Sequence, residues 1–148
     1  MSEDTATHWR DLADQLTPEQ IGRLETARWP DADELLDIAR DFAATNLLQV
    51  RMADVAAPAD TLKTGAWGAD GTDTKRTVYA GLWNTGNVIV EIVGEQSADG
   101  AVVWRLECRE ADRTEGDLMA GQARELARVL TDAADLLDRL DGTAPPFV

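Results

Sequence analysis

Cysteine and histidine are nearly absent from this chain, which contains one of each among its 148 residues. The single Cys108 excludes an intrachain disulfide and any zinc site built from several cysteines. A Ser/His/Asp or Cys/His triad would have to use His8, and no residue near it in the sequence suits such chemistry. We expect His8 to be solvated or to cap a helix, and Cys108 to fill core space as a small apolar residue.

Long apolar runs are also absent. No stretch approaches the ~20 residues that a membrane-spanning helix needs. The start Met1-Ser2-Glu3-Asp4 is acidic where a signal peptide is basic, and no apolar segment follows it. We therefore expect a cytoplasmic protein that does not bind membranes.

Negative charge is present in excess, with a net charge of −14. Residues 1–60 carry thirteen acidic against five basic side chains, residues 61–110 seven against five, and residues 111–148 eight against four. A surface this acidic disfavours direct binding to nucleic acids, because it repels phosphates. It is compatible with simple solubility, with a basic protein partner, or with mimicry of DNA towards a DNA-binding protein.

The hydrophobic content of 44% predicts one folded domain over residues 1–148, with a helical part at 7–56. Thr17-Pro18 and Asp31 are followed by Gln20 and Glu34 in the spacing of capping boxes. Residues 47–55 fit either a continued helix or an extra strand, and we prefer the helix. Residues 57–75, rich in Gly and Asp, predict a long loop in which Trp67 favours burial.

Residues 76–109 predict a three-stranded antiparallel meander with turns at 84–87 and 97–100. On the first strand, alternation directs Val78, Ala80 and Leu82 to one face. The opposite face is predicted to carry Tyr79, Trp83, Ile89 and Val93. On the third strand, Val102, Trp104, Leu106 and Cys108 are expected to point inward.

One face of this sheet needs a cover, and residues 117–141 predict a helix that provides it. That helix has a stripe in alternating steps of four and three: Met119, Ala123, Leu126, Leu130, Ala133, Leu137 and Leu140. Gly142 is expected to end it.

Clusters of carboxylates are the only groups in the sequence with a pattern that chemistry could use. Asp33, Asp37 and Asp41 repeat every four residues, which is typical of a solvated helix face, and no histidine joins them as a metal ligand. The segment 70–73 lacks the ligand pattern of a calcium loop, and the glycines at 65, 68 and 71 do not match a phosphate-binding loop. The sequence predicts no catalytic residue, no cofactor and no metal, hence no enzyme.

Five tryptophans are many for this length. Either each one caps the core at a different place, or some of them form an aromatic patch for a partner. The candidate interface consists of Trp67, Tyr79, Trp83, Ile89 and Val93. It is core if the N-terminal helices or the loop cover it, and otherwise an interface, including a homodimer built sheet to sheet.

Two segments carry a resemblance. Gly121-Gln122-Ala123-Arg124-Glu125-Leu126-Ala127, with the following Leu130 and 133–137, resembles the "ARELA…L…AAD" C-terminal helix of small actinobacterial and actinophage proteins of unknown function. The segment 9–21 is similar to an opening found in proteins encoded by actinobacterial mobile elements. The resemblance implies a short antiparallel sheet that precedes a C-terminal helix, and an actinobacterial or phage source. It carries no catalytic residue.

These observations predict an α+β fold: N-terminal helices, a three-stranded antiparallel meander and a long C-terminal helix packed on the sheet. We hypothesise a non-enzymatic, phage- or prophage-encoded accessory protein that acts through protein–protein interaction or self-association. One alternative is a DNA mimic that inhibits a DNA-binding protein and requires residues 31–41 and 132–141 to form one acidic band. Another is a small-ligand-binding or enzymatic module, with a pocket between the sheet and the 57–75 loop and Trp67 as its lid.

Overall fold

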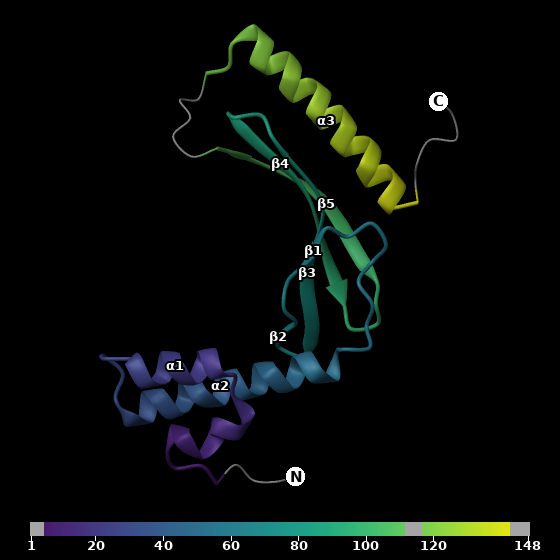
Figure 1. Ribbon diagram of the computed structural model, residues 1–148. Helices are drawn as coiled ribbons and strands as arrows, with labels where there is room; N and C mark the ends of the chain where they lie inside the picture. The colour runs from purple at the N-terminus through teal and green to yellow at the C-terminus, as the bar shows by residue number, and fades with distance from the viewer. Residues whose placement is uncertain (1–4, 112–116, 143–148) are drawn as a thin grey trace. The chain divides into compact units, whose positions relative to one another are not determined.

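The computed structural model describes residues 5–111 and 117–142 and shows an α+β protein with an antiparallel sheet and a C-terminal helix (Figure 1). The sequence predicts one domain, whereas the chain forms two compact units, Met1–Asp54 and Val55–Val148. Each unit contains a separate hydrophobic cluster. In the first unit, the apolar side chains of residues 32–51 pack against those of the two helices before them, and in the second unit the sheet packs against the C-terminal helix.

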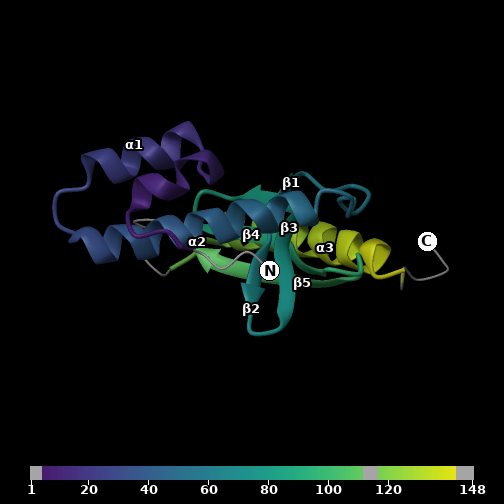
Figure 2. The ribbon, with the colours of Figure 1, turned by 90° about the horizontal axis from the view of Figure 1, so that it is seen from below.

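The first unit consists of three helices. They are the 3-10 helix η1 (Trp9–Gln15), α1 (Pro18–Thr26) and α2 (Ala32–Arg51). Both η1 and α1 lie against α2 (Figure 2). Trp9 and Leu12 of η1 are three residues apart and therefore share one side of a 3-10 helix, from which both enter the core. The remaining buried members of this core are Leu24, Leu36 and Ala39.

The helix starts follow the predicted capping chemistry. Thr17 and Gln20 form a capping box on α1, and Asp31 and Glu34 form another on α2. Helix α2 continues through Asn46 to Arg51, so the helical interpretation of this segment is confirmed. Asn46 does not break the helix, because its side-chain amide pairs reciprocally with that of Gln20 at 3.1 and 2.7 Å.

Asp11 gives the first unit a dependence on pH. Its carboxylate accepts backbone N–H groups from Thr7 and His8 at 3.0 and 2.9 Å, which lowers the pKa of Asp11 below 3.8. A lowered folded pKa contributes stability that is complete above the unfolded pKa and is lost as pH falls through the folded pKa. We expect NMR titration of the Asp11 carboxyl carbon to give a midpoint below 3.8, and the loss of η1 signals on acidification to be absent in Asp11→Asn. A midpoint at or above 3.8 would contradict this capping role.

The second unit contains a five-stranded antiparallel sheet in the order β1-β3-β4-β5, with β2 also paired to β3. Its elements are β1 (Lys63–Thr64), β2 (Gly68–Asp70), β3 (Asp73–Asn84), β4 (Val88–Ser97), β5 (Val102–Glu110) and α3 (Ala120–Leu140). The predicted meander 76–109 is thus present as β3, β4 and β5, and β3 starts three residues earlier than expected.

The prediction of a loop at 57–75 is wrong in part, because this segment supplies the two short strands β1 and β2. Lys63 and Thr64 pair with β3, and so do residues 68–70, while Gly65 N–H donates to the Thr77 carbonyl at 2.7 Å between the two strands. Gly71, with φ of +62°, forms the turn into β3. The glycine-rich composition suggested a loop, but pairing with β3 decides the backbone conformation.

Helix α3 covers one face of the sheet, as predicted, although it starts at Ala120 and not at Asp117 (Figure 1). Ala80, Val90, Ile92, Val129 and Ala133 are the buried members of this cluster. Gly142, with φ of +68°, follows the helix as its left-handed cap residue. We call this side of the sheet the first face, and the side turned away from α3 the second face.

A buried glutamine ties the start of the second unit to the sheet. Gln96 is 1% exposed, and its Nε2 donates to the carbonyls of Ala56 and Gly100 at 2.9 and 3.2 Å. Its Oε1 accepts from Arg76 Nε at 2.7 Å. The Arg76 guanidinium lies 4.6 Å from the ring centroid of the buried Trp67. This cluster explains the burial of Trp67 that the sequence predicted.

Candidate functional site

A β-bulge in β3 decides which side chains reach the second face. Tyr79 pairs with Val93, but Gly81 pairs with Ile92, so one extra residue, Ala80, is inserted. Because side chains alternate along a strand, the extra residue reverses the faces of everything after it. Tyr79 and Leu82 therefore lie on the same face, although their numbers differ by an odd step.

The bulge corrects two predictions. Trp83, expected on the second face, packs in the cluster beneath α3, and Leu82, expected in the core, is 60% exposed. Gly81 permits this arrangement, because a Cβ there would stand 2.6 Å from the Trp83 ring and 3.1 Å from Leu136 Cδ2. A glycine inside an apolar strand is the sequence signal for such a bulge.

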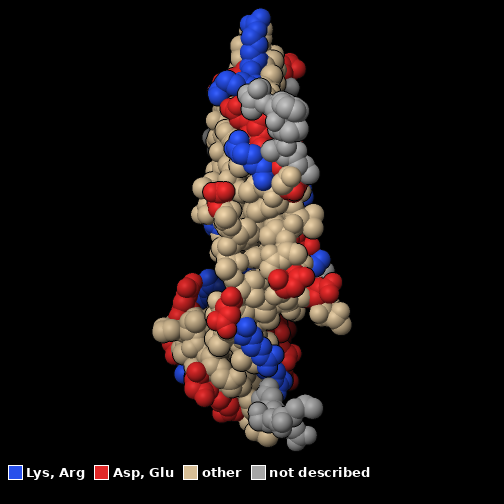
Figure 3. Space-filling model, turned by 90° about the vertical axis from the view of Figure 1, so that its right-hand side faces the viewer, with Lys and Arg blue, Asp and Glu red and all other residues tan. Residues whose placement is uncertain are grey.

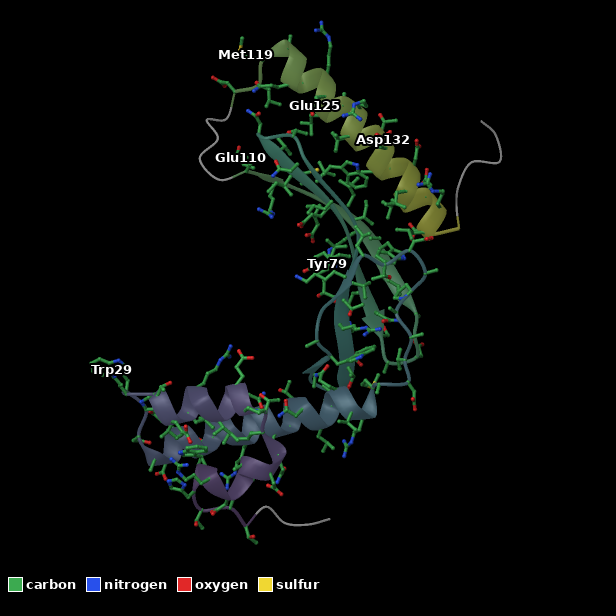
Figure 4. The ribbon with its side chains drawn as sticks, viewed as in Figure 1. Trp29, Tyr79, Glu110, Met119, Glu125 and Asp132 are labelled. Atoms are coloured by element: carbon green, nitrogen blue, oxygen red, sulfur yellow. The ribbon has the colours of Figure 1, made fainter. Side chains whose placement is uncertain are left out.

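The second face otherwise follows the prediction. Tyr79, Ile89 and Val93 alternate with the residues that contact α3, and Figure 4 shows Tyr79 on the side of the sheet away from that helix. Val93 is only 2% exposed, whereas Leu82 and Val103 are largely exposed. Val93 at the centre of this face is thus inaccessible to solvent, while the apolar side chains of Leu82 and Val103 at its margins remain accessible.

A shallow groove of about 270 Å³ lies at one margin of the second face. Its lining residues are Leu62, Lys63, Tyr79, Gly81, Leu82 and Glu91. Leu62 is 70% exposed, so apolar surface from β3 and from the segment before β1 meets in the groove. Lys63 Nζ stands 5.9 Å from the Tyr79 ring centroid, close enough for a cation–π contact. This volume lies just below the range of about 300 to 1,000 Å³ that is typical of pockets for drug-sized ligands.

Charge on the second face is balanced, unlike that of the whole chain. Its basic residues are Lys63, Lys75, Arg105 and Arg109, and its acidic residues are Asp73, Glu91, Glu95 and Glu107. They pair as Lys75–Glu95 at 2.8 Å, Arg105–Glu107 at 2.6 Å and Arg109–Glu91 at 3.7 Å. The bond from Lys75 lowers the pKa of Glu95 below 4.5. Basic and acidic side chains on this face therefore largely neutralise each other.

The structure brings together only part of the predicted interface. Tyr79, Ile89 and Val93 share the second face, whereas Trp67 is buried against Arg76 and Trp83 lies under α3. Trp67 does not line the groove and is not its lid. Of the six groove residues, only Tyr79 belonged to the predicted interface. No pattern placed Leu62 and Lys63 beside β3, and strict alternation placed Leu82 in the core.

Neither His8 nor Cys108 is a lining residue of this groove. His8 caps η1, and its Nδ1 accepts a hydrogen bond from the Arg10 N–H at 3.1 Å. Helix capping was one of the two roles predicted for His8. Cys108 is exposed, so the prediction of a core thiol is wrong: it lies near the end of β5, where the last four residues are all exposed. Within residues 5–111 and 117–142, no group of three His, Cys, Asp or Glu side chains could hold a metal ion.

Trp29 is the exception among the tryptophans. Two of the five are buried and two pack in the α3 cluster, but Trp29 is 95% exposed in the turn between α1 and α2. Figure 4 shows it projecting away from both helices. It is a separate exposed aromatic residue of the first unit.

Acidic side chains alternate with arginines in each unit. Arg40 lies 3.6 Å from Asp37 on α2, and Arg128 lies 3.5 Å from Asp132 on α3. Figure 3 shows acidic and basic side chains interspersed within each unit on the face that it displays. The DNA-mimic hypothesis requires one acidic band from residues 31–41 and 132–141, which belong to different units, and it stays a prediction.

Among the described residues, no helix has the length and apolar character needed to cross a membrane. Comparison with protein-family models, with curated proteins and with solved structures finds no match to this chain.

Proposed function

We propose that this protein acts by binding another protein through the groove on the second face, and not by catalysis. The observation that carries the proposal is the exposure of Leu62 and Leu82 on either side of Tyr79, where a groove of about 270 Å³ accepts one apolar side chain. Tyrosine flanked by apolar contacts is typical of interface residues that dominate binding energy.

The groove also indicates the chemistry of the partner. Lys63 and Glu91 add one positive and one negative group to its apolar lining. A complementary segment presents a leucine- or methionine-sized side chain, with a carboxylate on the Lys63 side and a basic group on the Glu91 side. The proposed role is that of an accessory protein in the cytoplasm of an actinobacterium, encoded by a phage or prophage, as the resemblance implies.

Leu82→Glu tests the proposal. Because Leu82 is largely exposed, the variant should keep the wild-type melting temperature, while a charge in the groove should weaken partner binding by about tenfold or more. The experiment captures partners from actinobacterial lysate on immobilised wild-type protein and then measures the affinity of the purified partner for each variant.

Val103→Glu is the matched control, because Val103 is exposed on the same face but does not line the groove. It should retain the partner. A wild-type protein that captures no stoichiometric partner, or a partner that binds Leu82→Glu as tightly as wild type, would reject the proposal.

Binding of a small ligand is the second candidate, because the groove lies where residues 62–63 of the 57–75 segment meet β3 and β4, close to where the sequence predicted a pocket. It predicts a compound that raises the melting temperature of the wild type but not of Tyr79→Ala. A small-molecule screen with no such compound, together with a protein partner that depends on Leu82, decides for protein binding.

A further inference from the structure

Among the residues that the structure describes, strand β5 forms one edge of the sheet and has β4 as its strand neighbour. The hydrogen bonds at the ends of this pair show which backbone groups face β4. Ser97 N–H donates to the Ala101 carbonyl at 2.8 Å, and Ala111 N–H donates to the Asn87 carbonyl at 2.9 Å. Since backbone direction alternates in an antiparallel strand, odd-numbered residues face β4 and even-numbered residues face the free edge. The outward set is Val102, Trp104, Leu106, Cys108 and Glu110.

This edge carries charged side chains, but it lacks several other features that prevent pairing with another strand. Edge strands are commonly short, interrupted by a bulge or proline, or marked by a charge on the buried side. The nine residues of β5 contain no proline, its register with β4 is unbroken, and Trp104 and Leu106 occupy the side beneath α3. The edge is therefore a long template with alternating charges on its second face.

We propose that β5 pairs antiparallel with β5 of a second copy of this chain, about a two-fold axis at Leu106, so that two sheets become one. The charges select this register. Arg105 then lies opposite the partner's Glu107, and Glu107 lies opposite the partner's Arg105, at the non-hydrogen-bonded sites where side chains are closest. The nine residues also overlap along their full length, because Leu106 is the midpoint of Val102–Glu110.

Other registers are worse. An axis at Glu107 places it against the partner's Glu107, and sets Arg105 against the partner's Arg109. An axis at Arg105 places two arginines together. An axis at Cys108 pairs Glu107 with the partner's Arg109 but leaves residues 102–105 without a partner within β5. Only the axis at Leu106 combines full overlap with opposite charges.

Self-association of a chain with a net charge of −14 needs such local complementarity. Arg105 and Glu107 already form an ion pair at 2.6 Å within one strand. In the dimer, this pair and its symmetry copy make a ring of four charges with alternating sign. On the first face, Leu106 meets the partner's Leu106 and Trp104 meets the partner's Cys108, which extends the apolar cluster across the axis.

Charge reversal with rescue tests the register. Analytical ultracentrifugation of the full chain from about 1 to 500 µM should show a reversible dimer. Arg105→Glu places a glutamate opposite the partner's Glu107 at each of the two symmetric sites. This repulsion should raise the dissociation constant of the dimer about tenfold or more. The double variant Arg105→Glu/Glu107→Arg restores both pairs and should return to within about threefold of wild type.

Arg124→Glu is the matched control, since it changes the net charge equally on the exposed surface of α3. It should leave the dimer within about threefold of wild type. A monomeric wild type over the whole range overturns the proposal, and so does a dimer that Arg105→Glu leaves intact or that the double variant fails to restore.

The native Cys108 provides a second measurement without substitution. With the axis at Leu106, the two Cys108 positions are separated by about 14 Å along the strands, from a rise of about 3.4 Å per residue. Nitroxide labels on Cys108 should give a single narrow distribution of inter-label distances in the short range. Oxidants should not form a disulfide between the two Cys108 residues. A Cys108–Cys108 crosslink or a broad long distance overturns the register. The β5 edge is separate from the groove, so this inference and the proposed function can fail independently.

Discussion

Replacing Gln96 by leucine should lower the free energy of unfolding of the second unit by about 2–4 kcal/mol. Leucine fills a similar volume but has no polar atoms. The carbonyls of Ala56 and Gly100 lose their donor, and Arg76 Nε loses its acceptor. An unpaired buried polar group costs about 1–3 kcal/mol. The total stays below three times this cost, because water that enters the site can bond to some of the three groups. The loss is large because every hydrogen-bonding group of the Gln96 amide is used.

The consequence should extend to Trp67. Arg76 reaches the Val55 carbonyl at 3.3 Å and stacks at 4.6 Å on the Trp67 ring, so its displacement loosens both contacts. Hydrogen exchange measured by mass spectrometry should show faster exchange in β2, β3 and β4, and a red shift in tryptophan emission should accompany it. The first unit should exchange as in the wild type, because its core is separate.

Gln122→Leu is the matched glutamine control. Gln122 bonds the Met119 N–H at 2.7 Å and Asn87 Oδ1 at 3.1 Å at the more accessible start of α3. Its loss should cost about 1 kcal/mol or less, in the range of a helix cap. Equal stability of Gln96→Leu and wild type would show that the buried cluster is not needed to hold residues 55–56 on the sheet.

Replacing Gly81 by alanine should destabilise the second unit by about 1–3 kcal/mol. The added methyl group would stand 2.6 and 2.7 Å from two atoms of the Trp83 ring, and 3.1 Å from Leu136 of α3. The indole is rigid and packed in the α3 cluster, so the contact can be relieved only if the Trp83 ring, the strand or the helix shifts. Urea unfolding and the exchange of α3 amides measure the effect.

Gly121→Ala is the opposite case in the same unit. Nothing lies within 4 Å of a Cβ at Gly121, which is near the start of α3. Alanine there should be neutral or stabilise by up to about 1 kcal/mol, because it only improves helix propensity. If both glycine variants behaved alike, the contact of Gly81 with Trp83 would not be what determines the fold of the bulge.

Local chemistry explains the parts of the structure that the sequence predicted. The capping boxes at Thr17 and Asp31, the turn glycines and the end of α3 before Gly142 depend on residues within a few positions of each other. The apolar stripe of α3 and the alternation in β4 are likewise periodic, so their burial could be inferred without knowing their partners. The two strand turns at 84–87 and 97–100 belong to this group.

The errors arise where pairing or packing overrides a local pattern. Strict alternation placed Leu82 in the core and Trp83 on the second face, and one inserted residue at the bulge reversed both. The segment 57–75 has the composition of a loop, yet β3 holds two parts of it as strands. Cys108 alternates as a core residue but sits at the exposed end of an edge strand.

The sequence by itself determined the elements of this protein: the capped helices, the antiparallel strands, and a sheet that needs a helix on one face. These depend on periodicity and on contacts between neighbours in the chain. Only the tertiary structure decided which side chains meet on the second face and which strand is left as an edge. A bulge and a strand order are properties of pairing between distant segments, so the groove at Leu62, Tyr79 and Leu82 and the free edge of β5 became visible only after folding.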